Sequence, residues 1–368
     1  MGDNEIVLLG CGDVGPVHGA IAPYSTLVRP VLAAGDIRFA QCERVYSTRG
    51  TRQAHALEGG RGTPDMASVF TDCGFNVVSL ASNLALDWGE DALLDTIELF
   101  QKQGIQVIGA GRNIEEARRP AIVEHNGVRV AILAYCSVPK EGYCAGPNRV
   151  GIAPLRAHTS YAPLELQAGM PPRVVSTPDA KDLECMAADI ARARQAAHVV
   201  VVSLHWGIHF IPRLIAEYQP LAAQAAFAAG ADLILGHHAH VPKAIEVQSG
   251  KVCFYSLSNF IFSTPFSGAT PQRAEHFLKR YGVTIDPEYP YLPFGTDGRR
   301  SMIAKAVISR AGIRKVSFLP ALIDKQLRPE VLKHGDPRFE EAVRFMDWVS
   351  EGYNHNFRLE GDEVLVEG

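Results

Sequence analysis

Three histidines stand within four residues in the segment Gly236-His-His-Ala-His240, directly after the apolar run Leu233-Ile-Leu235. His238 and His240 are two residues apart, a spacing that lets two imidazoles at the end of a strand reach one metal ion. Neutral imidazole is the commonest metal ligand in proteins, and α/β folds place their sites beyond the ends of buried strands. The segment therefore predicts a metal-binding or catalytic site. Hydrogen-bonded surface histidines are the alternative interpretation.

Polar residues follow other apolar runs in the same manner. Asp13, Asn83 and His205 each stand within a few residues of the end of such a run. A mixed set of carboxylates, amide and imidazole suits Zn, Mn or Fe(II), and a set of this size could hold one or two ions. Structural roles stay open as well: Asp13 could stabilise a turn and Asn83 could cap a helix. Glu43, a further candidate, could simply pair with Arg44.

The composition is that of an ordinary globular protein. Hydrophobic residues make up 47% and charged residues 21% of the 368 residues, so disorder is not indicated. The formal net charge is −4, and without a long basic run we expect no nucleic-acid partner. The 7 cysteines are scattered and lack CxxC spacing, which predicts reduced thiols in a cytoplasmic protein. The apolar stretch at residues 6–9 is too short for a signal or membrane segment, so no membrane partner is expected.

Short apolar runs alternate with segments of helical periodicity, which predicts a layered α/β fold. Helices are expected at residues 64–70, 91–103, 181–196, 220–229 and 338–349. Strands are expected at residues 6–9, 76–80, 106–110, 199–204 and 231–236, and hairpins at 121–135, 243–257 and 302–323. Residues 1–330 are expected to form one domain, on which a C-terminal helix and tail at 331–368 pack. Self-association stays open.

Two long stretches, residues 137–177 and 264–300, show no clear periodicity. Insertions of this length are uncommon in compact domains and are often lids or binding loops. The second insertion carries arginines and histidines among aromatic residues, a pattern that could hold an anionic, partly apolar substrate. A solvated loop is the plain alternative. The candidate substrate-binding residues are His18, His209, His237, Arg273, His276, Arg299 and Arg300.

Six segments in order resemble the motifs of the CapA family, which is named for poly-γ-glutamate capsule synthesis and belongs to the calcineurin-like metallophosphatase superfamily. They are Gly12-Asp13, Gln41-Cys-Glu43, residues 79–89, His205-Trp-Gly207, residues 236–241 and residues 255–260. The resemblance covers roughly residues 5–325. It implies a four-layer αββα sandwich with mixed sheets, long active-site insertions and a divalent metal centre at the strand ends. The metal ligands that it implies are Asp13, Glu43, Asn83, His205, His238 and His240.

This chain departs from the family pattern at Leu84, which stands where the family has a histidine after Asn83. In metallophosphatases that histidine lies near the leaving oxygen and stabilises or protonates it. Loss of such an acid costs ~10²–10⁴ in rate, so ordinary phosphatase activity is not expected. The family's glutamate after His-Trp-Gly is also absent, because Ile208-His209 stands there. A more apolar pocket favours an organic acid or a peptide as substrate.

Three functions remain open. The first is a metal-dependent hydrolase of an amide or ester bond in an anionic organic or peptide substrate, with Asp13, His205 and His240 as catalytic residues. The second is acid–base chemistry without hydrolysis, because epimerases of lasso-peptide precursors resemble members of this superfamily. In that case Asp13 and a histidine such as His240 would abstract and return an α-proton. The third is a non-catalytic binding protein, which would have little reason to keep so many candidate ligands.

Overall fold

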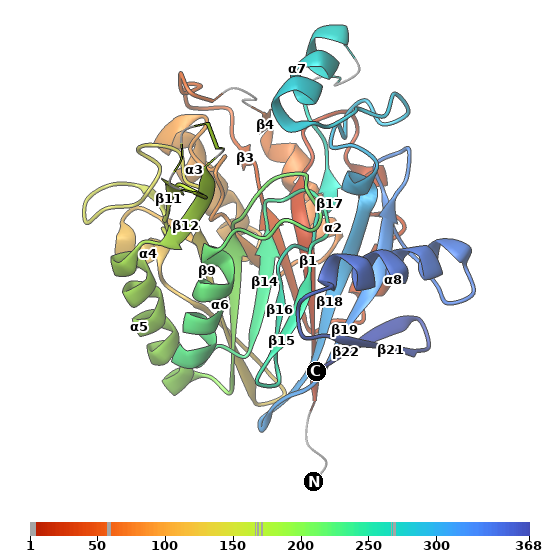
Figure 1. Ribbon diagram of the computed structural model, residues 1–368. Coiled ribbons are helices and arrows are strands. Elements are labelled where there is room, and N and C mark those ends of the chain that lie inside the picture. The colour runs from red at the N-terminus through yellow and green to blue at the C-terminus, as the bar shows by residue number, and fades with distance from the viewer. Residues whose placement is uncertain are drawn as a thin grey trace.

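Two mixed sheets stack face to face, and helices cover their outer faces (Figure 1). The computed structural model describes residues 5–56, 60–165, 167, 169–170, 172–265, 267 and 270–368. The arrangement is the four-layer αββα sandwich expected from the sequence. One apolar core lies between the sheets, and a second lies between the smaller sheet and its helices.

The larger sheet has ten strands in the order β21-β22-β19-β18-β1-β2-β5-β6, with β17 beside β1 and β20 beside β19. The central strand β1 is parallel to β2 and β17 and antiparallel to β18. The strands are β1 (Ile6–Gly15), β2 (Ile37–Cys42), β5 (Val77–Ser79), β6 (Gln106–Ile108), β17 (Asn259–Phe262), β18 (Arg300–Ser309), β19 (Gly312–Ile323), β20 (Pro329–Val331), β21 (Asn356–Glu360) and β22 (Glu363–Glu367).

The smaller sheet has six strands in the order β15-β16-β14-β13-β9-β8. Its inner strands are parallel, and β8 and β15 are antiparallel edge strands. The strands are β8 (Ala121–His125), β9 (Val128–Cys136), β13 (Val199–His205), β14 (Leu233–His237), β15 (Ile245–Gln248) and β16 (Lys251–Phe254). Short pairs lie outside both sheets: β3 (Val45–Tyr46) with β4 (Arg61–Gly62), β7 (Ala110–Gly111) with β10 (Gly151–Ile152), and β11 (Ala157–Ala162) with β12 (Arg173–Pro178).

Strand β13 shows how the sequence produces these layers. Every residue of Val199–His205 is buried. Val199 and Val201 contact the core between the sheets, whereas Val200 and Val202 contact the core under the helices. Because side chains alternate between the two faces of a strand, a strand covered on both faces needs an uninterrupted apolar run.

Helices α5 and α6 cover the smaller sheet, and α8 lies against β19 of the larger one (Figure 1). The α-helices are α1 (Arg29–Leu32), α2 (Ser68–Asp72), α3 (Gly89–Lys102), α4 (Ile114–Ala117), α5 (Ala180–Ala196), α6 (Tyr218–Ala229), α7 (Pro271–Tyr281) and α8 (Pro337–Ser350). The 3₁₀ helices are η1 (Ala22–Ser25), η2 (Pro64–Ala67) and η3 (Asp297–Arg299). In the part of the chain that the structure describes, no helix is long and apolar enough to cross a membrane.

The two insertions that we expected to be irregular contain regular elements, so that prediction is wrong. In the first, β11 and β12 form an antiparallel hairpin. In the second, α7 starts at Pro271 and ends before Gly282, which has a φ of +67°. Proline in the first turn and a left-handed glycine after the last are ordinary helix boundaries. The C-terminal tail also forms strands, since β21 and β22 extend the larger sheet.

Candidate metal centre

Four strand ends, two from each sheet, meet at one edge of the sandwich. Asp13 lies near the end of β1, and Glu43 directly follows β2. His205 is the last residue of β13, and His237 is the last residue of β14. The strand predicted at residues 6–9 continues to Gly15, so Asp13 lies inside β1 and not in a turn after it. Since β1 contacts β14 across the two sheets, the carboxylates of one sheet meet the histidines of the other.

A first group of side chains gathers around Nε2 of His205. Glu43, His205 and His238 each place a ligand atom within 4.8 Å of the others. His205 Nε2 lies 3.1 Å from Glu43 Oε1 and 3.2 Å from His238 Nδ1. It also lies 2.9 Å from Asn83 Oδ1. Ligands bound to one zinc ion at about 2.0–2.2 Å are roughly 3–3.6 Å apart, so these four side chains fit around one divalent ion.

A second group consists of Asp13, Glu43 and His240. His240 Nδ1 lies 3.8 Å from Asp13 Oδ2, and His240 Nε2 lies 3.6 Å from Glu43 Oε2. Glu43 thus presents Oε1 to the first group and Oε2 to the second. One carboxylate stands between the two groups, as in a centre whose two ions share a ligand.

The buried oxygens of both groups fit a bound cation. Asp13 and Glu43 are fully buried. Among the described residues, Asp13 Oδ1 and both Glu43 carboxylate oxygens have no hydrogen-bond partner. Asp13 Oδ2 accepts a hydrogen bond from the His238 backbone N–H at 3.2 Å. Buried carboxylate oxygens that are left without a donor are costly unless a cation neutralises them. The short contacts of Glu43 are with His205 and His240, so its proposed pairing with Arg44 is wrong.

Burial keeps the histidines of the centre neutral. It lowers the pKa of His205 to about 3 and that of His240 to about 4, and it holds the pKa of His238 well below its ordinary value. Burial raises the pKa of Asp13, to which the neighbouring Glu43 charge adds, and burial also raises the pKa of Glu43. Neutral imidazole is the metal-binding form, and a bound divalent ion favours ionised carboxylates.

The backbone around the histidines is strained. His238 and His240 have φ values of 87° and 57°, in a region that costs non-glycine residues ~1–3 kcal/mol. Gly236 lets β14 pass close to its neighbour, because a Cβ there would lie 2.2 Å from the Tyr255 carbonyl oxygen. Strain that survives in a buried segment is typical of functional sites.

Asn259, on β17, orients His240. Its Oδ1 lies 2.7 Å from His240 Nδ1, and its Nδ2 donates to the His240 carbonyl oxygen at 3.1 Å. Because Asn259 occupies Nδ1, the other ring nitrogen, Nε2, faces Glu43. Residues that bind one nitrogen of a metal-binding histidine commonly fix the orientation of its ring in this way. Asn259 is missing from the sequence-predicted set, although it lies in the motif at residues 255–260.

The three other predicted histidines differ in their distance from the centre. His237 is buried behind it, with Nδ1 3.4 Å from Asp13 Oδ1. His209 is half-buried at its edge, with ring centroids 3.8 Å from His238 and 5.6 Å from His240. His18 instead stacks on Tyr291 at 3.4 Å. Of the three, only His209 combines contact with the ligand histidines and partial exposure.

The predicted anion-binding residues of the second insertion do not gather at the centre. Arg299 lies 3.9 Å from Asp286 and over the Tyr289 ring. Arg300 pairs with Asp297 at 3.2 Å and with Glu341 at 2.7 Å. His276 is exposed on α7, where Arg273 is half-buried. The two arginines of η3 and β18 therefore serve the fold, and for Arg299 and Arg300 the predicted role in substrate binding has no support from their contacts.

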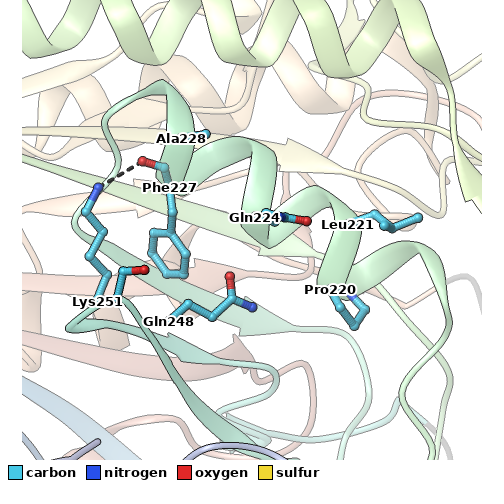
Figure 2. Close-up of a pocket in the computed structure, with 8 residues that line it drawn as sticks. Pro220, Leu221, Gln224, Phe227, Ala228, Gln248 and Lys251 are labelled. Atoms are coloured by element: carbon cyan, nitrogen blue, oxygen red, sulfur yellow. Dashed lines mark hydrogen bonds between the residues drawn. The ribbon is translucent and has the colours of Figure 1, made fainter.

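A surface groove lies away from these residues, between α6 and the β15–β16 hairpin (Figure 2). Its lining is largely apolar and amide-bearing, and Lys251 is its only ionisable side chain. Lys251 Nζ donates to the Phe227 carbonyl oxygen at 2.8 Å, as Figure 2 shows. With one occupied amine and no acid, the groove offers little for catalysis.

Comparison with known proteins identifies the family to which the chain belongs. The family described as "Bacterial capsule synthesis protein PGA_cap" matches residues 14–264, which include Glu43 and the predicted histidine ligands. Two relatives are named for the same process. The PGA biosynthesis protein CapA of Bacillus subtilis is 31% identical over 261 residues, 70% of this chain and 61% of that protein. The capsule biosynthesis protein CapA of Bacillus anthracis is 32% identical over 191 residues, 52% of this chain and 41% of that protein.

The chain thus spans less than two thirds of the length of either relative. The solved structure of the calcineurin-like phosphoesterase YfkN from Bacillus subtilis aligns with a TM-score of 0.43 and 12% identity, over 94% of this chain and 99% of that one.

Proposed function

Because this chain belongs to the bacterial capsule synthesis protein family PGA_cap, we propose that it is a metal-dependent hydrolase with two divalent ions that share Glu43. One observation supports the proposal most directly: two ligand groups, each with residues from both sheets, meet at a single buried carboxylate whose oxygens have no hydrogen-bond partner. The ions would be Zn, Mn or Fe, since the donors are imidazole nitrogen, carboxylate and amide oxygen.

Each residue has a role in this proposal. Asn83, His205 and His238 would hold one ion, Asp13 and His240 would hold the other, and Glu43 could serve either. When bound, the ions supply Lewis acidity that activates water and polarises the substrate oxygen.

His209 is the residue proposed to donate a hydrogen bond to the leaving group, because burial lowers its pKa to about 3 and its neutral imidazole keeps one N–H. It touches His238 and His240 but belongs to neither ligand group, and it is half-buried, so substrate can reach it. Leu84 is also half-buried and stands where the family has its leaving-group histidine. His209 would supply from another loop what Leu84 cannot.

An amide or ester in an anionic organic or peptide molecule is the proposed substrate. Leucine near the leaving group disfavours a phosphate ester, which needs a proton donor or cation there. Two relatives are named for PGA biosynthesis and capsule biosynthesis, and the CapA family, which the chain resembles, is named for poly-γ-glutamate capsule synthesis. A glutamyl amide is therefore the first substrate to try.

The test is hydrolysis of glutamyl-peptide amides and simple esters by protein loaded with Zn, Mn or Fe and by chelated protein. Cleavage that requires an added ion and is lost in Asp13→Asn supports the proposal. The acid–base alternative makes a different prediction, because it gives exchange of the peptide α-hydrogen in D₂O without cleavage and without need of an ion. That outcome would replace the hydrolase with an epimerase-like enzyme.

A further inference from the structure

A buried arginine lies beside the metal centre and has no role in it so far. Arg44 directly follows Glu43, and it is 3% exposed. Its guanidinium lies over the Phe262 ring, 4.9 Å from the ring centroid. Phe262 in turn lies 5.2 Å from the His240 ring. One aromatic side chain thus separates Arg44 from a ligand of the second group.

Among the described residues, no acid forms an ion pair with this arginine. Its Nε and Nη1 are buried without a hydrogen-bond partner. Glu43 feels the Arg44 charge, which lowers the pKa of Glu43, but its close contacts are with His205 and His240. Leaving a buried charge unpaired costs several kcal/mol, so such a group is normally found with a counter-ion.

Two glycines make room for the arginine. A Cβ at Gly15 would lie 2.8 Å from Arg44 Cγ, and one at Gly60 would lie 3.2 Å from the guanidinium carbon and from Nε. Neither glycine has a positive φ. Their backbones would accept other residues, so the lack of a side chain serves the space along Arg44.

We propose that Arg44 binds a second oxyanion of the substrate, a carboxylate or a phosphate, while the reacting group lies at Glu43 and His240. The guanidinium offers a planar fork that fits either anion with two parallel hydrogen bonds. Phe262 lies against the flat face of the guanidinium, and Nε and Nη1 are the nitrogens that have no partner in the structure. The inference rests on the proposed function only for the place of the reacting group. The charge preference belongs to Arg44 itself.

Three probes test the proposal by calorimetry on the zinc-loaded protein. Butyrate carries one carboxylate, glutarate carries two, and 3-phosphonopropionate carries a carboxylate and a phosphonate. We expect glutarate or 3-phosphonopropionate to bind about 10-fold more tightly than butyrate, the value of a hydrogen-bonded charge pair. Arg44→Gln should remove that advantage and leave butyrate binding unchanged. The dianion that loses more in the variant identifies the anion that Arg44 prefers.

Arg38→Gln is the matched control. Arg38 lies at the start of the same strand, β2, and its Nε is also buried without a partner. It should keep the full preference for a second anion. Arg44→Lys keeps the positive charge but lacks the planar fork, so it should recover only part of the preference for dianions over butyrate. Such partial recovery would show that Arg44→Gln loses anion binding and not its fold. Equal affinity of the unaltered protein for butyrate and both dianions, or an undiminished advantage in Arg44→Gln, would overturn the proposal.

A second readout does not depend on hydrolysis or on zinc. In chelated protein labelled with ¹⁵N-arginine, glutarate should shift the Nε–H signal of Arg44, assigned by its absence in Arg44→Gln. If the signal shifts but the protein has no hydrolase activity, the anion site is supported and the proposed reaction is not. If the protein is active but glutarate causes no shift and Arg44→Gln does not change the preference, the reaction is supported and the anion site is rejected.

Discussion

The strand ends and the second insertion are equally rich in residues that bind metals or anions, yet only the strand ends bring them together. Asp13, Glu43 and the histidines after β13 and β14 lie within hydrogen-bonding or near-contact distance of one another. Arg299 and Arg300 of the insertion pair with acids of their own surroundings. Residue type alone therefore does not make a site. What makes this one is that two parallel strand pairs end at the same edge.

The comparison also separates two kinds of burial. Asp13 Oδ1 and both Glu43 carboxylate oxygens are buried without a hydrogen-bond partner, whereas Arg299 and Arg300 of the insertion are half-buried and paired with acids. A buried polar atom without a partner calls for a ligand, and a paired surface charge does not. The same reasoning singles out Arg44, which lies beside the strand ends and is the unpaired cation nearest to Glu43 in the sequence.

The largest expected effect follows from removing a ligand at the strand ends. Asp13→Asn and His240→Ala should each abolish activity, a loss beyond the ~10²–10⁴ of a missing proton donor, and should lower the bound metal while the circular dichroism spectrum stays unchanged. His276→Ala, on the exposed face of α7, should leave both quantities as they are. Full activity in either ligand variant would refute the site.

His209→Ala tests whether the edge of the centre supplies a hydrogen-bond donor to the leaving group. We expect kcat to fall by ~10²–10³, because that donor is lost, with metal content unchanged since His209 is in neither ligand group. Substrates with good leaving groups, such as nitrophenyl esters, should lose much less. A loss that is equal for good and poor leaving groups would assign the hydrogen-bond donor to another residue.

Leu84→His should restore what the family pattern has at this position. Leu84 is half-buried next to Asn83, whose amide oxygen contacts His205. A histidine there should raise hydrolysis of a phosphate monoester by about 10-fold or more, measured as released phosphate. Leu84→Met is the control, because it keeps an apolar side chain and should give no increase. If Leu84→His does not hydrolyse the phosphate monoester faster, Leu84 is not what limits phosphatase activity.

The smallest effect is expected in the insertion. Arg300→Ala removes contacts with Asp297 and Glu341. Partly exposed ion pairs contribute up to about 1 kcal/mol, so thermal unfolding should shift slightly and KM for an anionic substrate should stay the same. A several-fold rise in KM would show that the insertion, too, takes part in binding.

The parts of the molecule that the sequence predicts well are those with a strong local pattern. The uninterrupted valines of β13 predict a buried strand, and His205 at its end and His238 and His240 after β14 then follow from the parallel pairing of the two strands. The sharing of Glu43 could not be predicted, because it depends on how the two sheets stack.

Other features carry weaker signals in the sequence. Pro271 and Gly282 mark the two ends of α7, but other prolines and aromatic residues lie nearby, so the sequence did not predict this helix. Strands β21 and β22 are short, and most of β21 is exposed, so their pattern resembles that of a tail. Arg44 was taken as a partner of Glu43 because the two are adjacent. The side chains diverge, and only their three-dimensional surroundings show it.

The central claim is that two buried ligand groups share Glu43 around two divalent ions. Metal analysis combined with anomalous diffraction at the Zn, Mn and Fe edges tests it most directly. We predict two ions per chain, one beside His205 and His238 and one beside Asp13 and His240, with Glu43 in contact with both. Protein that binds no ion, and whose activity is unaffected by chelator, would contradict the account.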